Sequence, residues 1–148
     1  MWETEEIDNE SNLYIRVHEN FISSKDKKPK SSAFSNTPKE GDNLSSDWSK
    51  YCTPHSSRAL IGKQKKRKDG TYKNPSSFFI WSLRVENVRN DINPNQEVKH
   101  DPVYNDPEDD YVPNNRAHSI IIGEKPVNNA EFRVGMLKIG QWAIEPDK

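Results

Sequence analysis

The sequence lacks the residue patterns that mark the common kinds of enzyme active site. It contains a single cysteine, Cys52, which excludes an internal disulfide and a cysteine-based zinc site within one chain. Its six glycines never cluster, so no glycine-rich loop is present to cradle a phosphate group. No serine lies in a Gly-x-Ser-x-Gly context, which leaves a serine nucleophile without support. The chain therefore carries no catalytic signature.

Apolar residues are also scarce. Hydrophobic residues make up 31% of the 148 positions, against roughly 45–50% apolar usage in globular chains, and charged residues make up 30%. We therefore expect a thin core wrapped in long polar loops. The length fits one domain, over residues 11–148, and the acidic residues 1–10 are expected to form a flexible tail with few core contacts.

The charge and the apolar runs limit the partners. No run approaches the roughly 20 apolar residues that span a bilayer, and no apolar leader follows Met1. We therefore expect a soluble, cytoplasmic protein without a membrane partner. The net charge of -1 excludes a global field that would attract nucleic acid. Cys52 is interpreted as a buried spectator thiol, because its neighbours give no sign of a paired base.

Several segments are predicted to be β-strands. Residues 13–22 begin with alternating apolar and polar side chains, which is typical of a strand with one buried face. Residues 78–81 and 117–122 are dense apolar runs that indicate buried strands, and residues 96–100 fit a short edge strand. We expect Phe34, Trp81 and Trp142 in the core, and Trp2 at the surface.

Helices are predicted between these strands. Ser45 or Ser46 is expected to cap a short helix through Cys52, because Trp48, Tyr51 and Cys52 form one apolar stripe at helical spacing. Further helices are predicted over residues 53–61, 82–89 and 128–142. The expected fold class is α+β. A small, mostly antiparallel sheet would be covered on one face by the helices near Trp48, Arg58 and Phe132.

His18 and His118 are the candidate catalytic residues. Each follows an arginine by two positions, Arg16 and Arg116, so each pair shares one face of its strand. If the two strands pair, the four side chains converge on a patch that suits a phosphate-bearing ligand. Arginine would bind the anion and histidine would move protons. The alternative is that each pair lies on the solvated side of its strand.

No metal or cofactor is predicted. None of the four histidines has H-x-x-x-H spacing on a predicted helix, and no cluster of cysteine and histidine exists. A second candidate binding region is the basic run at residues 63–68, in which Lys65, Lys66 and Lys68 could contact a phosphate backbone and nearby Tyr72 could stack on a base. The alternative is a solvated loop, because the run precedes a predicted turn at Asp69-Gly70.

Five short motifs resemble those of a group of small, uncharacterised bacterial proteins. In this chain they read Arg16-Val17-His18, Ser31-Ser32-Ala33-Phe34, Leu44-Ser45-Ser46-Asp47-Trp48, Asn115-Arg116-Ala117-His118 and Gly123-Glu124-Lys125. The resemblance runs from Leu13 to Trp142 and implies one compact bacterial domain. It implies no activity.

Two kinds of function remain open from the sequence. The first is a small binding or accessory module that acts with a larger protein partner, in a setting such as bacterial conflict or defence. The thin core, the long loops and the missing catalytic signature favour it. The second is a small enzyme that acts on a phosphate-containing substrate, RNA or a nucleotide, through His18, His118, Arg16 and Arg116.

Overall fold

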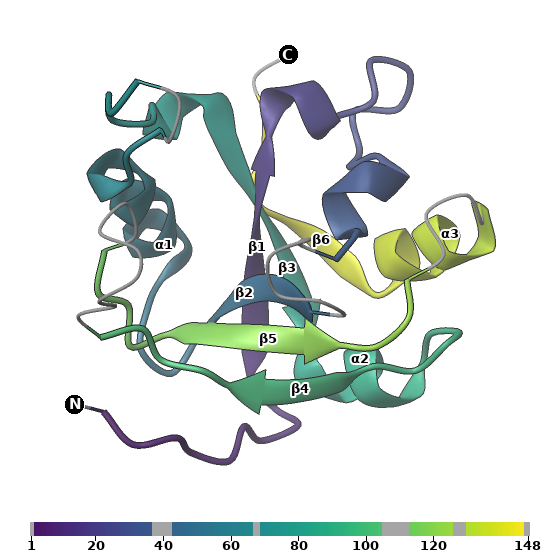
Figure 1. Ribbon diagram of the computed structural model, residues 1–148. Coiled ribbons are helices and arrows are strands. Elements are labelled where there is room, and N and C mark those ends of the chain that lie inside the picture. The colour runs from purple at the N-terminus through teal and green to yellow at the C-terminus, as the bar shows by residue number, and fades with distance from the viewer. Residues whose placement is uncertain (1, 37–42, 67–68, 105–112, 126–129, 147–148) are drawn as a thin grey trace.

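Six strands form one antiparallel sheet in the part of the chain that the structure describes. A computed structural model describes residues 2–36, 43–66, 69–104, 113–125 and 130–146. The sheet order is β4-β5-β2-β1-β3-β6 (Figure 1). The strands are β1 (Asn12–His18), β2 (Asn43–Trp48), β3 (Phe78–Arg84), β4 (Glu97–His100), β5 (His118–Ile122) and β6 (Gly140–Ile144). The helices are α1 (Pro54–Leu60), α2 (Val85–Asn90) and α3 (Ala130–Lys138), with short 3-10 turns that include η1 (Glu19–Phe21) and η2 (Ser31–Phe34).

Strand β1 forms where the sequence alternates, as predicted. Leu13, Ile15 and Val17 are buried in the main core, and Arg16 and His18 lie on the opposite face. The predicted strand ends earlier than expected, because η1 begins directly after His18. β1 pairs with β3 along its whole length, so these two strands form the longest ladder of the sheet.

The sheet bends sharply between β1 and β2. These strands pair only at Leu13–Trp48 and Tyr14–Asp47, and β2, β5 and β4 then run across the direction of β1 and β3 (Figure 1). Beyond Tyr14 and Asp47, in the part of β1 that includes Arg16, the two strands move apart. The divergence leaves space between β1 and β2 for polar side chains, among them Asp47 of β2, which Ser57 of α1 reaches.

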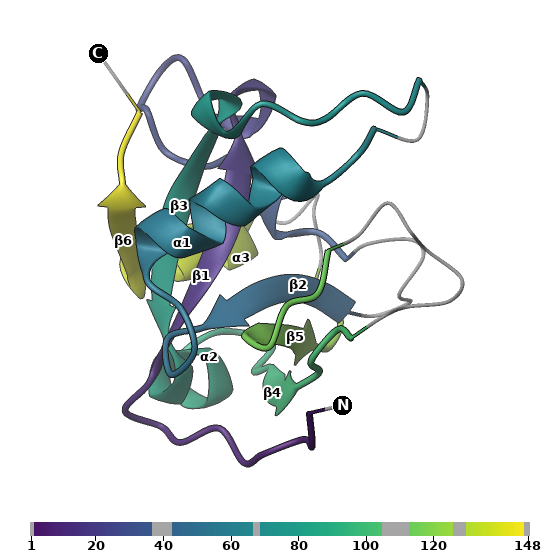
Figure 2. The same cartoon turned by 90° about the vertical axis from the view of Figure 1, so that its left-hand side faces the viewer.

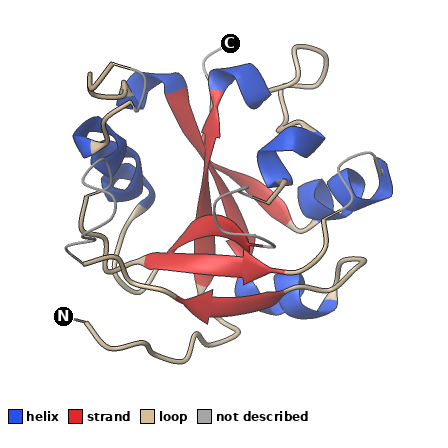
Figure 3. Cartoon of the chain, viewed as in Figure 1, coloured by secondary structure: helices blue, strands red, loops and turns tan. Residues whose placement is uncertain are grey.

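Helices cover both faces of the sheet, which corrects the prediction of one covered face (Figure 3). Figure 2 shows α1 in front of β1 and β3, with α3 behind them. Phe34 of η2, Val88 of α2 and Met136 of α3 belong to the main core with Leu13 and other apolar side chains of the sheet. Both faces carry apolar side chains that need cover, because Ile80, the cross-strand partner of Arg16, is as fully buried as Leu13 on the other face.

The expected α+β class is confirmed, and so is the start of α1. Thr53 forms a capping box with Ser56, and Pro54 occupies the first turn, where its missing N–H leaves no hydrogen bond unmade. The edge position of β4 and the core positions of Phe34 and Trp81 are confirmed as well.

The helix predicted from Ser45 or Ser46 to Cys52 is wrong. Residues 43–48 are strand β2, which pairs with β5 along its length. The serine hydroxyls that were expected to cap a helix lie within the sheet, and the Ser46 and Ser119 hydroxyls are 3.1 Å apart across the strand pair. Pairing with β5 along its length and with β1 at its end engages the β2 backbone in the sheet, so the helical spacing of three later residues does not decide the local structure.

The predicted helix over residues 128–142 is wrong in its second half. α3 ends at Lys138, and β6 begins at Gly140. A β-carbon at Gly140 would lie 2.2 Å from Nε1 of Trp81, so only glycine fits at this approach of β6 to β3. Trp142 is therefore half-buried on an edge strand, with its ring edge-on to Trp81, and is less buried than expected.

The N-terminal residues lie against the sheet. Ile7 is 3% exposed and belongs to the main core, and the guanidinium of Arg89 donates to its carbonyl at 2.9 Å. The expectation of few core contacts in residues 1–10 is therefore wrong at Ile7. Trp2 is half-buried rather than exposed, because its ring packs edge-on against Tyr104. None of the helices in the described residues is long and apolar enough to cross a bilayer.

Candidate functional site

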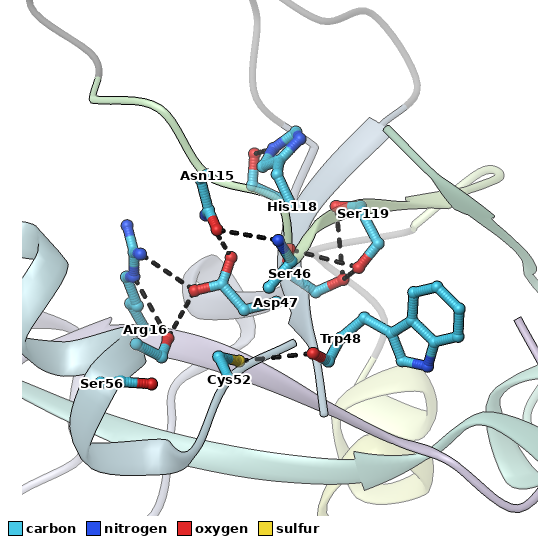
Figure 4. Close-up of polar contacts among 12 residues, drawn as sticks. Arg16, Ser46, Asp47, Trp48, Cys52, Ser56, Asn115, His118 and Ser119 are labelled. Carbon is cyan, nitrogen blue, oxygen red and sulfur yellow. Dashed lines mark hydrogen bonds and ion pairs between the residues drawn. The ribbon is translucent and has the colours of Figure 1, made fainter. Parts of the chain in front are cut away.

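A buried carboxylate, Asp47 of β2, organises the polar groups between β1 and β2 (Figure 4). Oδ2 of Asp47 lies 2.9 Å from Nη2 of Arg16 and accepts from the Ser57 hydroxyl at 2.5 Å. Oδ1 accepts from the side-chain amide of Asn115 at 2.8 Å. The Asp47 side chain is 5% exposed, and the Arg16 side chain is 21% exposed. These four residues, called the Asp47 network below, join β1, β2, α1 and the segment that precedes β5.

The Asp47 network satisfies its own charges. A buried carboxylate is costly unless a cation and hydrogen-bond donors surround it, and Arg16, Ser57 and Asn115 supply them. The guanidinium predicted to bind an external anion is therefore already paired with an internal one. The sequence analysis assigned no role to Asp47, Ser57 or Asn115. The available signal was a charged residue within Leu44-Ser45-Ser46-Asp47-Trp48, a segment that alternates once it is treated as a strand.

His118 lies next to this network and connects a carboxylate with a hydroxyl. It is the cross-strand partner of Asp47. Its Nδ1 lies 2.7 Å from the Asp101 carbonyl and 3.4 Å from the Asp101 carboxylate, and its Nε2 lies 3.2 Å from the Ser45 hydroxyl. Burial lowers the pKa of His118, but hydrogen bonds with Asp101 outweigh burial and leave this pKa above its ordinary value.

His18 does not share a patch with His118. The prediction required their strands to pair, but β2 lies between β1 and β5. Asp47 faces Tyr14 on one side and His118 on the other, so His18 lies four residues farther along β1, about 13 Å at the usual rise per residue. There its Nδ1 accepts from the Asn20 backbone N–H at 3.1 Å, and its ring packs edge-on against Phe78. His18 is a cap for η1.

The Arg116 side chain contacts neither Asp47 nor His18, but Tyr51 and Glu5. Its guanidinium lies 4.1 Å over the ring of Tyr51 and 3.9 Å from the Glu5 carboxylate. Of the four candidate residues, the fold therefore brings only Arg16 and His118 into one neighbourhood, through Asp47. Residues two apart share a face only within a strand, and Arg116 precedes the first residue of β5.

Residues 64–66 of the basic run and residues 71–73 form the two arms of a hairpin that leaves the body of the molecule beyond α1 (Figure 2). Lys65 and Tyr72 form an antiparallel bridge, and the Lys66 N–H donates to the Thr71 carbonyl at 2.6 Å. Gly70 has a φ of 73°, which the predicted Asp-Gly turn requires. Tyr72 is 60% exposed, with Nζ of Lys65 5.9 Å from its ring centre. Lys68 lies outside the described residues.

The remaining candidates offer no reactive group. The Cys52 thiol is half-buried, and its Sγ donates to the Trp48 carbonyl at 3.4 Å. Burial and the nearby Asp47 carboxylate raise the pKa of the Cys52 thiol to about 12, so it stays protonated at neutral pH. Within residues 2–36, 43–66, 69–104, 113–125 and 130–146, no three histidine, cysteine or acidic side chains are placed to hold a metal ion.

Fold and site together define a single-domain α+β protein with a buried polar network at a bend in its sheet. Comparisons of the chain with models of protein families, with curated proteins and with solved structures gave no match. The resemblance to a bacterial group therefore remains a prediction.

Proposed function

We propose that the protein is a small binding module whose basic hairpin, residues 64–73, contacts single-stranded nucleic acid. The observation that carries the proposal is the difference in pairing between two sets of cations. Arg16 is paired internally with Asp47, whereas none of the ion pairs between described residues involves Lys65 or Lys66. The expectation of a larger protein partner remains a prediction.

The local charge of the hairpin region supports a polyanionic partner. Residues 58–73 contain seven lysine or arginine residues and one acidic residue, in a chain whose net charge is -1. Lysines that follow a backbone attract phosphates regardless of sequence and release counterions when they bind. The exposed ring of Tyr72, next to Lys65, can stack on an unpaired base, which favours single strands over a duplex.

The test is fluorescence anisotropy with a labelled single-stranded oligonucleotide at several salt concentrations. Changing Lys65 and Lys66 together to Ala should weaken binding about 10-fold or more and reduce the salt slope by about 0.7 for each lost phosphate contact. Tyr72→Ala should weaken binding by a comparable factor. Lys99 and Lys138, both exposed, provide a control pair with the same change in charge.

Two outcomes would overturn the proposal. One is the absence of binding by the wild-type protein at low salt. The other is an equal loss of oligonucleotide affinity in the Lys65 and Lys66 variant and in the Lys99 and Lys138 variant, because binding would then depend on the net charge of the protein. Tight binding to polyglutamate without binding to the oligonucleotide would instead indicate an acidic protein partner.

A second candidate function is acid–base chemistry at His118 on a phosphate-containing substrate. The supporting observation is that its imidazole lies between the Ser45 hydroxyl and the Asp101 carboxylate. A histidine oriented by a carboxylate and within reach of a hydroxyl can move a proton to or from a substrate oxygen. His18 has no part in this version.

Hydrolysis of bis(4-nitrophenyl) phosphate and of a labelled RNA tests the second candidate. His118→Gln should abolish turnover, whereas His18→Gln should leave it unchanged. Failure of the wild-type protein to turn over either substrate, or equal activity in both variants, would exclude it.

A further inference from the structure

A glutamate from the N-terminal segment occupies a cluster of basic and hydroxyl groups from two other parts of the chain. Oε1 of Glu5 lies 2.5 Å from Nζ of Lys50, and Oε2 accepts a short hydrogen bond from the Tyr51 hydroxyl. Nη2 of Arg116 lies 3.9 Å from the same Oε2. The backbone N–H of Glu5 donates to Nδ1 of His100 at 3.1 Å. Three donors and a fixed backbone contact therefore position one carboxylate.

The sheet positions these donors independently of Glu5. Because β2 and β5 are antiparallel with Asp47 opposite His118, the last residues of β2 and the first residues of β5 lie at the same end of this strand pair. Lys50 and Tyr51 follow β2, and Arg116 precedes β5. Figure 1 shows the N-terminal segment near this end of the strand pair.

Aromatic contacts hold the donors in place. Arg116 lies 4.1 Å over one face of the Tyr51 ring, and the ring of His100 is stacked on Tyr51 at 6.0 Å and 25°. Nε2 of His100 also lies 2.7 Å from the Arg116 carbonyl. Lys50 lies 5.3 Å from the ring centres of both Trp48 and Tyr51. The donor set is thus a built feature of the folded sheet.

The charges in the cluster leave an excess of positive charge. Lys50 and Arg116 supply two cations, and Glu5 supplies one anion. The side chains of Lys50 and Arg116 are 50% and 46% exposed, so an external ligand can reach them. A guanidinium, an ammonium and a phenol hydroxyl form a donor set that binds carboxylates and phosphates in proteins.

We infer that Lys50, Tyr51 and Arg116 form an oxyanion-binding site, for the carboxylate or phosphate group of a ligand, which Glu5 occupies in cis. Exposed ion pairs are individually weak, so a competing anion can displace the Glu5 side chain while Ile7 keeps the segment anchored. A tethered group competes at a high effective concentration. The site therefore favours a ligand with more than one negative charge, such as a phosphate dianion.

This inference goes beyond the hairpin function. The oxyanion site lies beside the N-terminus, and the hairpin lies at the opposite end of the molecule in Figure 2. The two sites share no residue, so each can be tested without the other.

The experiment is an NMR titration of the full-length protein with inorganic phosphate and, separately, with glutarate. In Glu5→Ala, the backbone signals of Lys50, Tyr51 and Arg116 should shift and saturate at a phosphate concentration at least about 10-fold lower than in the wild type. Adding Arg116→Ala to that variant should weaken phosphate binding about 10-fold or more, because a charge-assisted contact is lost.

Glu6→Ala is the matched control. Glu6 is the next residue in the chain and is exposed, so this variant loses the same charge without a change at the site. It should behave like the wild type. Should Glu5→Ala fail to fold, Glu5→Gln provides a second variant with the same expected result. It removes the negative charge and keeps the shape of the side chain.

Two results would overturn the inference. One is the absence of saturable shifts at the three residues in Glu5→Ala and Glu5→Gln. The other is an equal gain of phosphate binding in Glu6→Ala, because the effect would then be one of net charge. With the inference upheld, tighter binding of phosphate than of glutarate identifies a phosphate-bearing ligand, and the reverse order identifies an acidic side chain.

Discussion

Nη2 of Arg16 on β1 lies 2.9 Å from Oδ2 of Asp47 on β2, and this ion pair spans the place where the two strands stop pairing. Beyond Tyr14 and Asp47 no ladder hydrogen bonds join the strands. The ion pair and the Ser57 hydroxyl of α1 take their place. The Asp47 network therefore stabilises the bend that gives the protein its shape.

Removing Asp47 should destabilise the protein strongly. Asp47→Ala leaves Arg16, Ser57 and Asn115 without their shared acceptor, and the free energy of unfolding should fall by about 3 kcal/mol in urea denaturation. Asp26→Ala is the control, because Asp26 pairs with Arg133 but its side chain is 44% exposed. The control should lose at most about 1 kcal/mol. Equal losses would contradict a structural role for the Asp47 network.

The pair formed by His118 and Asp101 should make stability depend on pH. The hydrogen bond from His118 lowers the pKa of Asp101 in spite of burial, and Asp101 raises the pKa of His118 in spite of burial. The His118 contribution is complete below about pH 6.5 and is lost as pH rises through its folded pKa. The Asp101 contribution is present above about pH 4 and is lost as pH falls through its folded pKa.

Their sum is therefore largest between about pH 4 and pH 6.5. Asp101→Asn should cost more stability at about pH 5.5 than at about pH 8.5, by less than about 1 kcal/mol, because the Asp101 side chain is 55% exposed. His118 also faces Asp47, and Asp101 also faces His100; both stay unchanged in this variant. An NMR titration should show a lower pKa of His118 in the variant. A stability difference that does not change with pH would contradict the prediction.

The N-terminal segment should contribute to stability through Ile7. Ile7→Ala should lower the free energy of unfolding by roughly 2–5 kcal/mol, because it opens a cavity in the main core. Val134→Ala removes a side chain that is 58% exposed, and its effect should stay within about 0.5 kcal/mol. Chemical denaturation of both variants measures the difference. An Ile7→Ala protein as stable as the wild type would show that burial of the Ile7 side chain does not stabilise the fold.

Cys52 should react slowly in the folded protein. With its pKa raised to about 12, only a very small fraction of the thiol is ionised at pH 8. Alkylation by iodoacetamide should therefore be at least about 100-fold slower in the native protein than in the same protein unfolded in guanidinium. Because the chain has one cysteine, mass spectrometry measures the rate directly. Similar rates in both states would show that the thiol is accessible and reactive.

Local sequence patterns determined the elements that depend on neighbouring residues in the chain. The alternation of Leu13, Ile15 and Val17 specifies β1, because one face of that strand is buried along its length. The Thr53-Pro54 start specifies α1, because capping depends on residues within one turn. The Asp69-Gly70 turn specifies the hairpin for the same local reason.

Only the tertiary structure decided which strands are neighbours, and with them the candidate sites. Trp48, Tyr51 and Cys52 satisfy a helical spacing, yet β5 supplies hydrogen bonds that make residues 43–48 a strand. The insertion of β2 between β1 and β5 separates His18 from His118 and joins Arg16 to Asn115 through Asp47. Glu5 meets Arg116 although 111 positions separate them in the printed sequence. Such long-range pairings depend on the summed burial of many residues, which no short motif encodes.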